Sequence, residues 1–151
     1  MTCARITSLL LLSCFLAACA SSRPAKKIDG IWNANLQNPD GSVAYTFMAT
    51  LAQTTGSNVD VSSFLFTATA PCFTDPIGQT AMFDATGHSG GFETGPFGMS
   101  IATAHGTMVE NTLTLDGSRG SDGNISGSWT LTGLAGCSGG GTYTLSALKP
   151  L

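Results

Sequence analysis

The residue types in this sequence that could carry chemistry are a serine in a glycine-rich run, two histidines and five cysteines. Ser138 stands in the run Gly136-Cys137-Ser138-Gly139-Gly140, which formally matches the G-x-S-x-G pattern around a nucleophilic serine. That pattern activates the serine only where a strand turns sharply into a helix, beside groups that stabilise the oxyanion. Here the chain continues as glycine-rich, strand-like sequence, so we expect no catalysis at Ser138 and no enzymatic activity.

Metal binding is the second chemistry to consider. His88 and His105 are the only histidines, and neither has an acidic companion at the spacing of metal ligands. Residues 116–124 are rich in oxygen ligands, but they lack the alternating acids and the bidentate glutamate of a calcium loop, and Arg119 opposes a cation. We therefore expect exposed loop histidines, a flexible hairpin loop at 116–124, no metal and no cofactor.

Cys19 ends a segment with the pattern of an export signal. Arg5 supplies a positive charge, and residues 6–18 form an apolar stretch that is too short to span a bilayer. The residues Leu16-Ala17-Ala18-Cys19 at its end resemble the lipobox of bacterial lipoproteins. Cleavage after Ala20, at the A-x-A sequence of residues 18–20, is the alternative and would release a soluble periplasmic protein.

The resemblance implies that Cys19 is the lipid attachment site and the first residue of the mature protein. Its sulfur would carry a diacylglycerol and its amine a further acyl chain such as palmitate, which together hold a protein on a membrane. The residue after Cys19 is Ala20 and not aspartate, which resembles the sequence of lipoproteins that are sent to the outer membrane. We therefore expect a protein of the bacterial cell envelope, facing the periplasm or the cell surface. Its expected parts are a signal peptide at 1–18, a flexible tether at 19–28 and a folded domain at 29–148.

Two cysteines belong to the folded domain, because Cys3 and Cys14 leave with the signal. In an oxidising compartment we expect Cys72 and Cys137 to form a disulfide. The bond would close a loop of about 65 residues, which stabilises a fold by roughly 4 kcal/mol.

The composition of the mature chain limits the possible partners of the protein and its fold class. Without Arg5, five Lys/Arg stand against nine Asp/Glu, so we expect no nucleic-acid partner. Only 10% of the residues are charged and 19 are glycine, a composition that favours strands and turns over helices. The length suits one domain, and we expect a monomer.

Apolar and polar residues alternate with a period of two from residue 29 onward, interrupted by turn-forming residues. The alternation predicts eight strands, with apolar positions within 32–36, 43–51, 59–66, 81–85, 97–101, 113–115, 125–131 and 143–147. The phase slips at Ser62-Ser63, which predicts a β-bulge. Eight strands joined by short hairpins indicate an all-β, antiparallel up-and-down barrel, with a β-sandwich as the alternative architecture.

One short pattern occurs twice in the sequence. Ile28-Asp29-Gly30-Ile31-Trp32 and Ile125-Ser126-Gly127-Ser128-Trp129 both follow I-x-G-x-W. The first copy resembles the G-x-W opening of lipocalins and the avidin-type start of calycin-like barrels. This resemblance implies that the glycine allows close approach and that the indole of Trp32 plugs one end of the barrel. Neither the avidin ligand residues nor the later lipocalin motifs are present, so no binding site carries over.

The inward-facing aromatic residues could line a ligand cavity or fill the barrel as its core. The residues considered for both roles are Trp32, Tyr45, Phe47, Phe97, Trp129 and Tyr143. An eight-stranded barrel holds little more than its own side chains, which favours the core. The disulfide would close the end that carries Cys72 and Cys137, and we expect any open end to carry residues 38–42, 86–91 and 116–124.

These observations predict a membrane-anchored envelope lipoprotein that acts by binding, as an interaction or inhibitor-type module. Small exported barrel inhibitors of lysozyme and of metalloproteases are similar in size, disulfide count and G-x-W start. The alternative is a lipocalin-like carrier of a small apolar ligand. The expected partners are the membrane, reached through the lipid, and an envelope protein or a small apolar molecule.

Replacing the cysteine of the lipobox tests the anchor. Cys19→Ala should move the protein from the membrane fraction to the soluble fraction, because no other segment of the sequence is long enough to hold it in a bilayer. Cys14→Ala, within the expected signal, is the matched control and should leave the distribution unchanged. Unchanged partitioning of Cys19→Ala on cell fractionation would refute the anchor.

Overall fold

The computed structural model describes residues 26–74, 77–105, 107–134 and 136–150 of the chain. In these residues all regular secondary structure is β-strand, in nine strands along the chain. The strands are β1 (Gly30–Gln37), β2 (Val43–Gln53), β3 (Asn58–Phe66), β4 (Ile77–Phe83), β5 (Gly87–Ser89), β6 (Phe92–His105), β7 (Met108–Arg119), β8 (Ile125–Thr132) and β9 (Gly139–Pro150).

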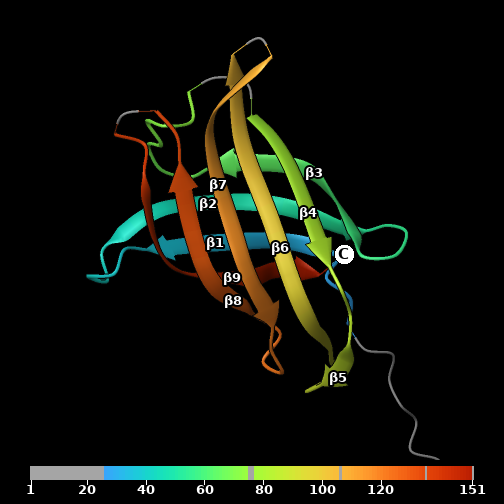
Figure 1. The fold of residues 1–151 in the computed structure, drawn as a ribbon. Coiled ribbons are helices and arrows are strands. Elements are labelled where there is room, and N and C mark those ends of the chain that lie inside the picture. Colours follow the sequence, from blue (N-terminus) through green and yellow to red (C-terminus); the bar gives the residue numbers. More distant parts are fainter. Residues whose placement is uncertain (1–25, 75–76, 106, 135, 151) are drawn as a thin grey trace, which may run out of the picture.

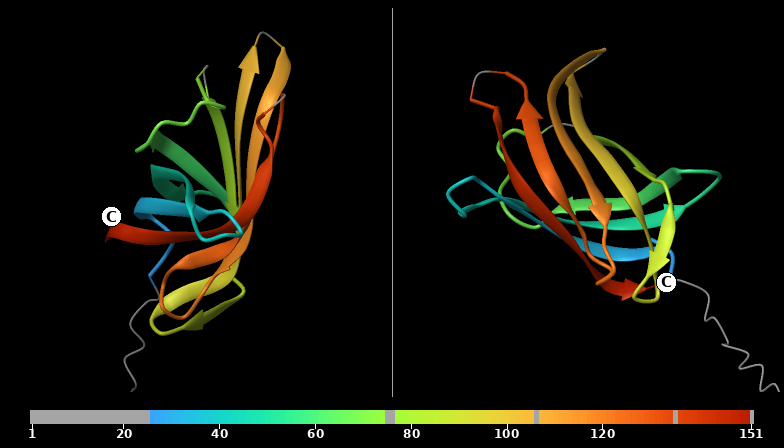
Figure 2. Two further views of the ribbon diagram at one scale, coloured as in Figure 1. Left: turned by 90° about the vertical axis from the view of Figure 1, so that its left-hand side faces the viewer. Right: turned by 60° about the horizontal axis from the view of Figure 1, so that its bottom comes forward.

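Eight of the strands close into an antiparallel barrel, which confirms the predicted fold class and excludes the sandwich. Neighbouring strands pair from β1 to β4 and from β6 to β9, β4 pairs directly with β6, and β9 returns to pair with β1. The short β5 is an addition outside this circuit and pairs with the start of β6. Figure 1 shows β1–β3 crossing behind the steeply inclined β4 and β6–β8, with β9 curving between the two groups, and Figure 2 shows the same strands from two further sides.

The period-two alternation places one face of every strand inside the barrel. In β1 the residues Trp32, Ala34 and Leu36 are buried, while the residues between them are partly exposed. The inward side chains of the barrel pack into one hydrophobic cluster. Its largest fully buried apolar members are Trp32, Phe47, Phe83, Ile28, Leu36, Leu51, Ile101, Leu113, Leu115, Ile125 and Leu145.

The β-bulge predicted in the third strand is confirmed. Thr50 of β2 pairs with Ser63, whereas the next residue, Leu51, pairs with Val61. Ser62 is therefore the extra residue, and it allows Val59 on one side and Phe64 on the other to face the core.

The seam between β3 and β4 is the least paired part of the barrel wall. Only Asn58 and Val59 of β3 are paired with β4, opposite Met82 and Ala81. From Asp60 to Phe66, β3 has no paired residue in β4.

The loops lie alternately at two ends of the barrel. The loops after β1, β3, β6 and β8 lie at one end, which we call the disulfide end because it carries Cys72 and Cys137. Lys26, Pro150 and the turns after β2, β5 and β7 lie at the other, which we call the terminal end. The expected placement of residues 38–42 at an open end with 86–91 and 116–124 is therefore wrong. A first hairpin and a third hairpin must share an end in an up-and-down barrel, and 38–42 lie at the disulfide end.

Several element boundaries also differ from the sequence prediction. Strand β7 continues to Arg119, so the expected loop at 116–124 is a turn of residues 120–124. The expected strand over 97–101 begins at Phe92, and Ala85 lies outside β4 and is exposed. Ile28, expected in the tether, is buried in the core. The expected signal peptide, and the tether up to residue 25, lie outside the described residues.

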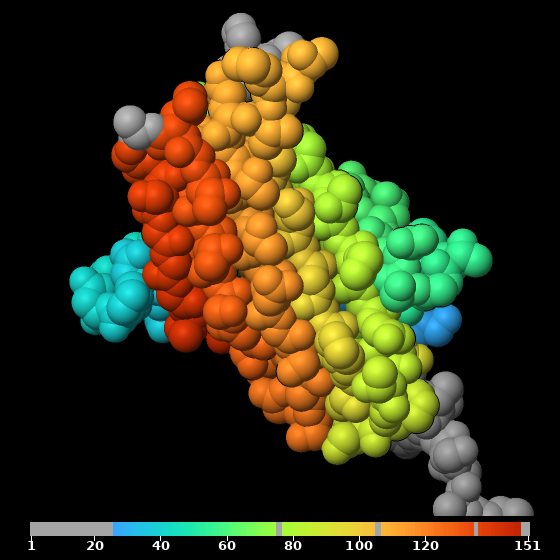
Figure 3. Space-filling view, viewed as in Figure 1, coloured from blue at the N-terminus to red at the C-terminus, as the bar shows by residue number. Residues whose placement is uncertain are grey.

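Within the part of the chain that the structure describes, no helix is long and apolar enough to cross a membrane. The outer face over β8, β7, β6 and β4 forms a continuous packed surface in Figure 3. The hairpin of β6 and β7 projects beyond its neighbours at the disulfide end in the same view.

Two glycines allow the backbones of β7 and β8 to approach closely in this wall. Gly117 of β7 and Gly127 of β8 lie opposite each other, and a Cβ on Gly127 would lie 2.5 Å from the Cα of Gly117 and would overlap the carbonyl oxygen of Asp116. Backbone atoms held by the sheet cannot move aside, so only glycine fits at this position. A Cβ on Gly78 of β4, in contrast, would have no neighbouring atom within 4 Å.

These two glycines form a matched pair for mutagenesis. Gly127→Ala should lower the free energy of unfolding by about 3 kcal/mol or more, because the added methyl group forces the β7–β8 ladder apart. Gly78→Ala should change it by about +0.5 kcal/mol, because alanine restricts the unfolded chain at no steric cost. Urea unfolding measures both, and equal effects of the two substitutions would contradict this packing.

Candidate functional site

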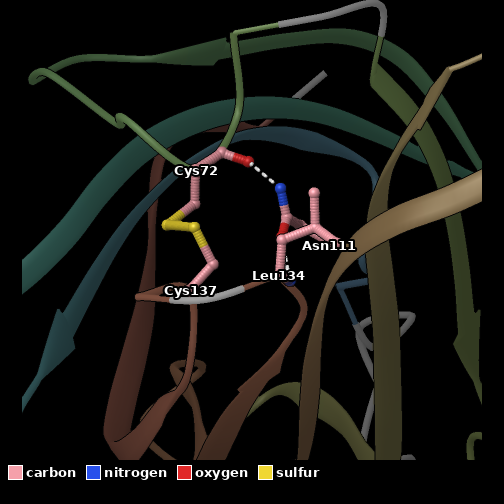
Figure 4. Close-up of a disulfide and its surroundings, with 4 residues drawn as sticks. All are labelled: Cys72, Asn111, Leu134 and Cys137. Carbon is pink, nitrogen blue, oxygen red and sulfur yellow. Dashed lines mark hydrogen bonds between the residues drawn. A yellow bond between two sulfur atoms is a disulfide. The ribbon is translucent and has the colours of Figure 1, made fainter.

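The disulfide end is fastened by one covalent bond and one asparagine side chain. Cys72 and Cys137 form a disulfide with a Cα–Cα distance of 5.7 Å, as the sequence predicted. Asn111 of β7 lies beside it (Figure 4), and its Nδ2 donates to the carbonyl oxygen of Cys72 at 2.8 Å. Its Oδ1 accepts from the backbone N–H of Leu134 at 3.1 Å. Asn111 thus holds the same two loops that the disulfide joins.

An aromatic cluster lies beneath these loops. The ring of Tyr45 contacts Phe66, Phe73 and Trp129, with centroids 5.9–6.1 Å apart. Two of these contacts are edge-to-face, the arrangement that aromatic rings prefer. Trp129 also donates its Nε1–H to the carbonyl oxygen of Gln37 at 2.9 Å. Burial raises the pKa of Tyr45, so its hydroxyl stays neutral at physiological pH.

The rim of the disulfide end exposes large aliphatic side chains to solvent. Met108 is 73% exposed, Val109 64%, Leu134 59% and Val43 57%. They come from three different hairpins, and Glu110 and the exposed Asp40 lie at the same end. Large apolar side chains that are exposed on a small domain are candidates for an interaction surface.

The terminal end is filled by a buried arginine between two aromatic rings. Arg119 is 3% exposed, and its guanidinium carbon lies 5.3 Å from the ring centre of Trp32 and 5.0 Å from that of Phe92. Its Nε donates to the carbonyl oxygen of Gly123 at 3.2 Å and its Nη1 to that of Lys26 at 2.9 Å. Burial lowers the pKa of Arg119, whereas the charges of Glu93 and Asp29 act in the opposite direction.

Trp32 completes this arrangement and fixes the incoming chain. Its Nε1–H donates to the carbonyl oxygen of Ile28 at 2.7 Å, four residues earlier. The indole therefore stands at one end of the barrel, as the G-x-W resemblance implied. The second copy of the pattern differs, because Trp129 lies toward the disulfide end and binds Gln37 instead of its own segment.

A pocket of about 230 Å³ opens at the terminal end beside Arg119. It is lined by Lys26, Lys27, Asp29, Trp32, Phe92, Arg119, Asp122, Gly123, Asn124 and Ala147. The lining mixes aromatic rings with charged groups of both signs. A second hollow, of about 390 Å³, is lined by residues of β4, β6 and β7 and by Ser57 and Asp84.

Tyr143 is buried against the glycine pair in the wall. A Cβ on Gly117 would lie 2.6 Å from the Tyr143 hydroxyl, so the phenol fills the space that the glycine leaves. The hydroxyl has no hydrogen-bond partner among the described residues. Burial raises its pKa, with a further contribution from Asp116, so Tyr143 is not an acid or a base at neutral pH.

The aromatic residues singled out from the sequence do not form one site. Trp32, Phe47, Phe97, Trp129 and Tyr143 are all buried, and Tyr45 is partly buried. Tyr45 and Trp129 meet under the disulfide, whereas Trp32 packs with Arg119 at the opposite end. Five of the six therefore belong to the core, which agrees with the packed interior favoured from the sequence.

The other residues considered for chemistry lie apart from one another. Ser138 is exposed next to the disulfide and is followed by β9, not by a helix. His88 is exposed in β5. Among the described residues there is no group of three His, Cys, Asp or Glu side chains that could hold a metal ion.

Sequence reasoning missed the two polar residues that organise the ends, Asn111 and Arg119. Both continue the inward phase of Leu113 and Leu115 along β7, where an apolar residue is expected. A polar residue in the inward phase is the signal that could have found them, since a buried polar group needs a partner. Their partners Cys72 and Trp32 lie on other strands or loops, and nothing in the sequence connects these residues with Asn111 or Arg119.

The fold defines the class of the protein as a closed, eight-stranded antiparallel β-barrel with one additional short strand. This architecture is consistent with the calycin-like barrel indicated by the G-x-W opening. No known protein family matches the chain, and no curated protein or solved structure shows significant similarity to it.

The packing at the terminal end gives a stability prediction. Arg119→Lys should lower the free energy of unfolding by about 2–4 kcal/mol, because a lysine loses the stacked guanidinium and its two carbonyl contacts. Lys27→Gln, an exposed change in the same pocket, should stay within about 0.5 kcal/mol. Urea unfolding compares the two variants. An Arg119→Lys protein as stable as the original would show that the stacking contributes nothing.

Proposed function

We propose that this protein is a lipid-anchored module of the bacterial cell envelope that binds a partner protein through its disulfide end. The observation that carries the proposal is the placement of the two ends. The chain enters the barrel at Lys26, at the terminal end, whereas the exposed aliphatic rim lies at the opposite end. A lipid on Cys19 would therefore hold the terminal end near the membrane and direct the rim away from it.

The disulfide end has the properties that a rigid binding surface requires. Its loops are joined by the disulfide and by Asn111, so they lose little conformational entropy when a partner binds. Met108, Val109 and Leu134 supply apolar area, and Asp40 and Glu110 add negative charge at the edge. Such a surface suits a partner protein with an apolar patch and neighbouring basic groups.

A non-enzymatic role is part of this proposal. Supporting it, Ser138 and His88 lie exposed in different parts of the fold, and the buried Tyr143 stays neutral. Neither the disulfide end nor the pocket at the terminal end brings together a nucleophile and a base among the residues described here.

A carrier of a small apolar molecule is the second candidate function. The observation in its favour is the seam between β3 and β4, where Phe64, Phe66 and Ile77 are only partly buried. Against it stands the filled interior, in which Trp32, Phe47 and Phe83 are fully buried. A ligand would have to occupy the seam and the aromatic cluster near Tyr45, beside Trp129.

Site-specific photo-crosslinking in intact cells tests the partner proposal. A photo-reactive residue in place of Met108 should give a discrete adduct with an envelope protein, because this position is the most exposed apolar point of the rim. The same residue in place of Ser128, exposed on the outer wall of β8, is the matched control and should give none. Adding Val109→Ser should weaken the Met108 adduct at least severalfold.

The absence of an adduct at position 108, or equal adducts at positions 108 and 128, would overturn the proposal. If that absence is accompanied by a saturable change of Trp129 fluorescence with an apolar ligand, the carrier function is established instead.

A further inference from the structure

Positive charge is confined to one end of the barrel in the described residues. Among the residues whose side chains the structure describes, the lysines and arginines are Lys26, Lys27 and Arg119, and all three lie at the terminal end. All three line the same pocket of about 230 Å³. The side chains described at the disulfide end include the acids Asp40 and Glu110 and no lysine or arginine.

Arg119 brings a buried positive charge to this pocket without a carboxylate partner. Its recorded hydrogen bonds go to the carbonyl oxygens of Gly123 and Lys26, and within the described part of the chain it forms no ion pair. A guanidinium removed from water is costly unless negative charge lies near it. Glu93 and Asp29 act on it only through longer-range attraction.

The two carboxylates in the lining are already engaged by donors of the protein. Asp29 Oδ1 accepts the backbone N–H of Gln53 at 2.7 Å. Both oxygens of Asp122 accept from Asn124, at 3.1 Å from the backbone N–H and 2.9 Å from Nδ2. Lys26 lies over the ring of Phe92, and the side chains of Lys26 and Lys27 are exposed. The lining therefore carries three cations and two carboxylates, which leaves one positive charge in excess.

We propose that this pocket binds a phosphate group, either from an anionic lipid head group or free in solution. The guanidinium of Arg119, clamped between Trp32 and Phe92, forms the fixed positive wall, and the exposed ammonium group of Lys27 closes on the anion from the solvent side. The volume is sufficient for a phosphate and its immediate substituents. In the lipid form the inference rests on the proposed membrane anchor, because the tether leaves the barrel at Lys26, on the pocket wall. A phosphate bound there would seat the terminal end on the head groups.

The two tryptophans give the test an internal control. Trp32 lines the pocket and Trp129 lies toward the opposite end, so their indole N–H signals in two-dimensional ¹H–¹⁵N spectra report on the two ends separately. The Cys19→Ala protein is titrated with inorganic phosphate, with vesicles of phosphatidylcholine, and with vesicles containing one quarter phosphatidylglycerol. Sodium chloride at matched ionic strength is the reference. The Trp32 signal should shift or broaden with phosphate and with the anionic vesicles, while the Trp129 signal stays in place under phosphate.

Variants that change the charge of the pocket should weaken or strengthen phosphate binding in a predictable direction. Lys27→Gln should weaken the apparent affinity about fivefold, the effect of one lysine near an anionic surface. Asp122→Asn should strengthen it severalfold, because it removes a repelling charge while the asparagine can still accept from the Asn124 backbone. Asp40→Asn, at the disulfide end, should have no effect.

The arms of the experiment separate the sources of the phosphate. A Trp32 response to both ligands shows that the site recognises the phosphate group itself, and a response to anionic vesicles alone shows a head-group site. A Trp32 response equal to that in sodium chloride, or charge variants without effect, would overturn the inference. If the Trp32 signal responds but Cys19→Ala leaves the membrane partitioning unchanged, the phosphate site stands and the lipid anchor is refuted. If the Trp32 signal does not respond but Cys19→Ala releases the protein from the membrane, the anchor stands and the phosphate site is refuted.

Discussion

The pairing of β1 with β9 is the constraint on which the rest of the structure depends. It joins the first strand to the last, so that β1 has a hydrogen-bonded neighbour on each side. Closure turns one face of every strand inward and removes the outer edges that an open sheet would expose. Because the inward positions then surround a narrow space, large residues such as Trp32 and Phe47 fill it completely.

Closure leaves two ends, and the chain seals them by different physical means. At the disulfide end, a covalent bond and the two hydrogen bonds of Asn111 join loops that follow β3 and β8. At the terminal end, Arg119 is held between Trp32 and Phe92 and binds the carbonyl oxygens of Gly123 and Lys26. The first end is covalently fixed and presents apolar groups with acidic neighbours, whereas the second carries the lysines and the arginine. This difference is what leads us to assign a partner surface to one end and a phosphate site to the other.

The strand pattern was predictable because burial in a closed sheet follows the period-two alternation directly. It located all eight barrel strands and the bulge at Ser62, and the cysteine count located the disulfide. The short β5 was missed because Gly87–Ser89 has no apolar alternation. The predicted position of residues 38–42 was wrong because the first and third hairpins of an up-and-down barrel lie at the same end, although the turn itself was located correctly. Arg119 and Asn111 were missed because their roles depend on contacts with Trp32 and with Cys72. The closed barrel brings these residues together, and the local sequence does not show it.

The orientation of the barrel on a membrane is the claim that joins the two ends into one account. It can be measured on the lipidated protein in vesicles with a spin label at Met108→Cys or at Ser121→Cys, exposed positions at the disulfide end and the terminal end. A relaxation agent confined to the bilayer surface should act strongly on the label at position 121 and not on the label at position 108. Equal relaxation at the two positions, or stronger relaxation at position 108, would contradict the account.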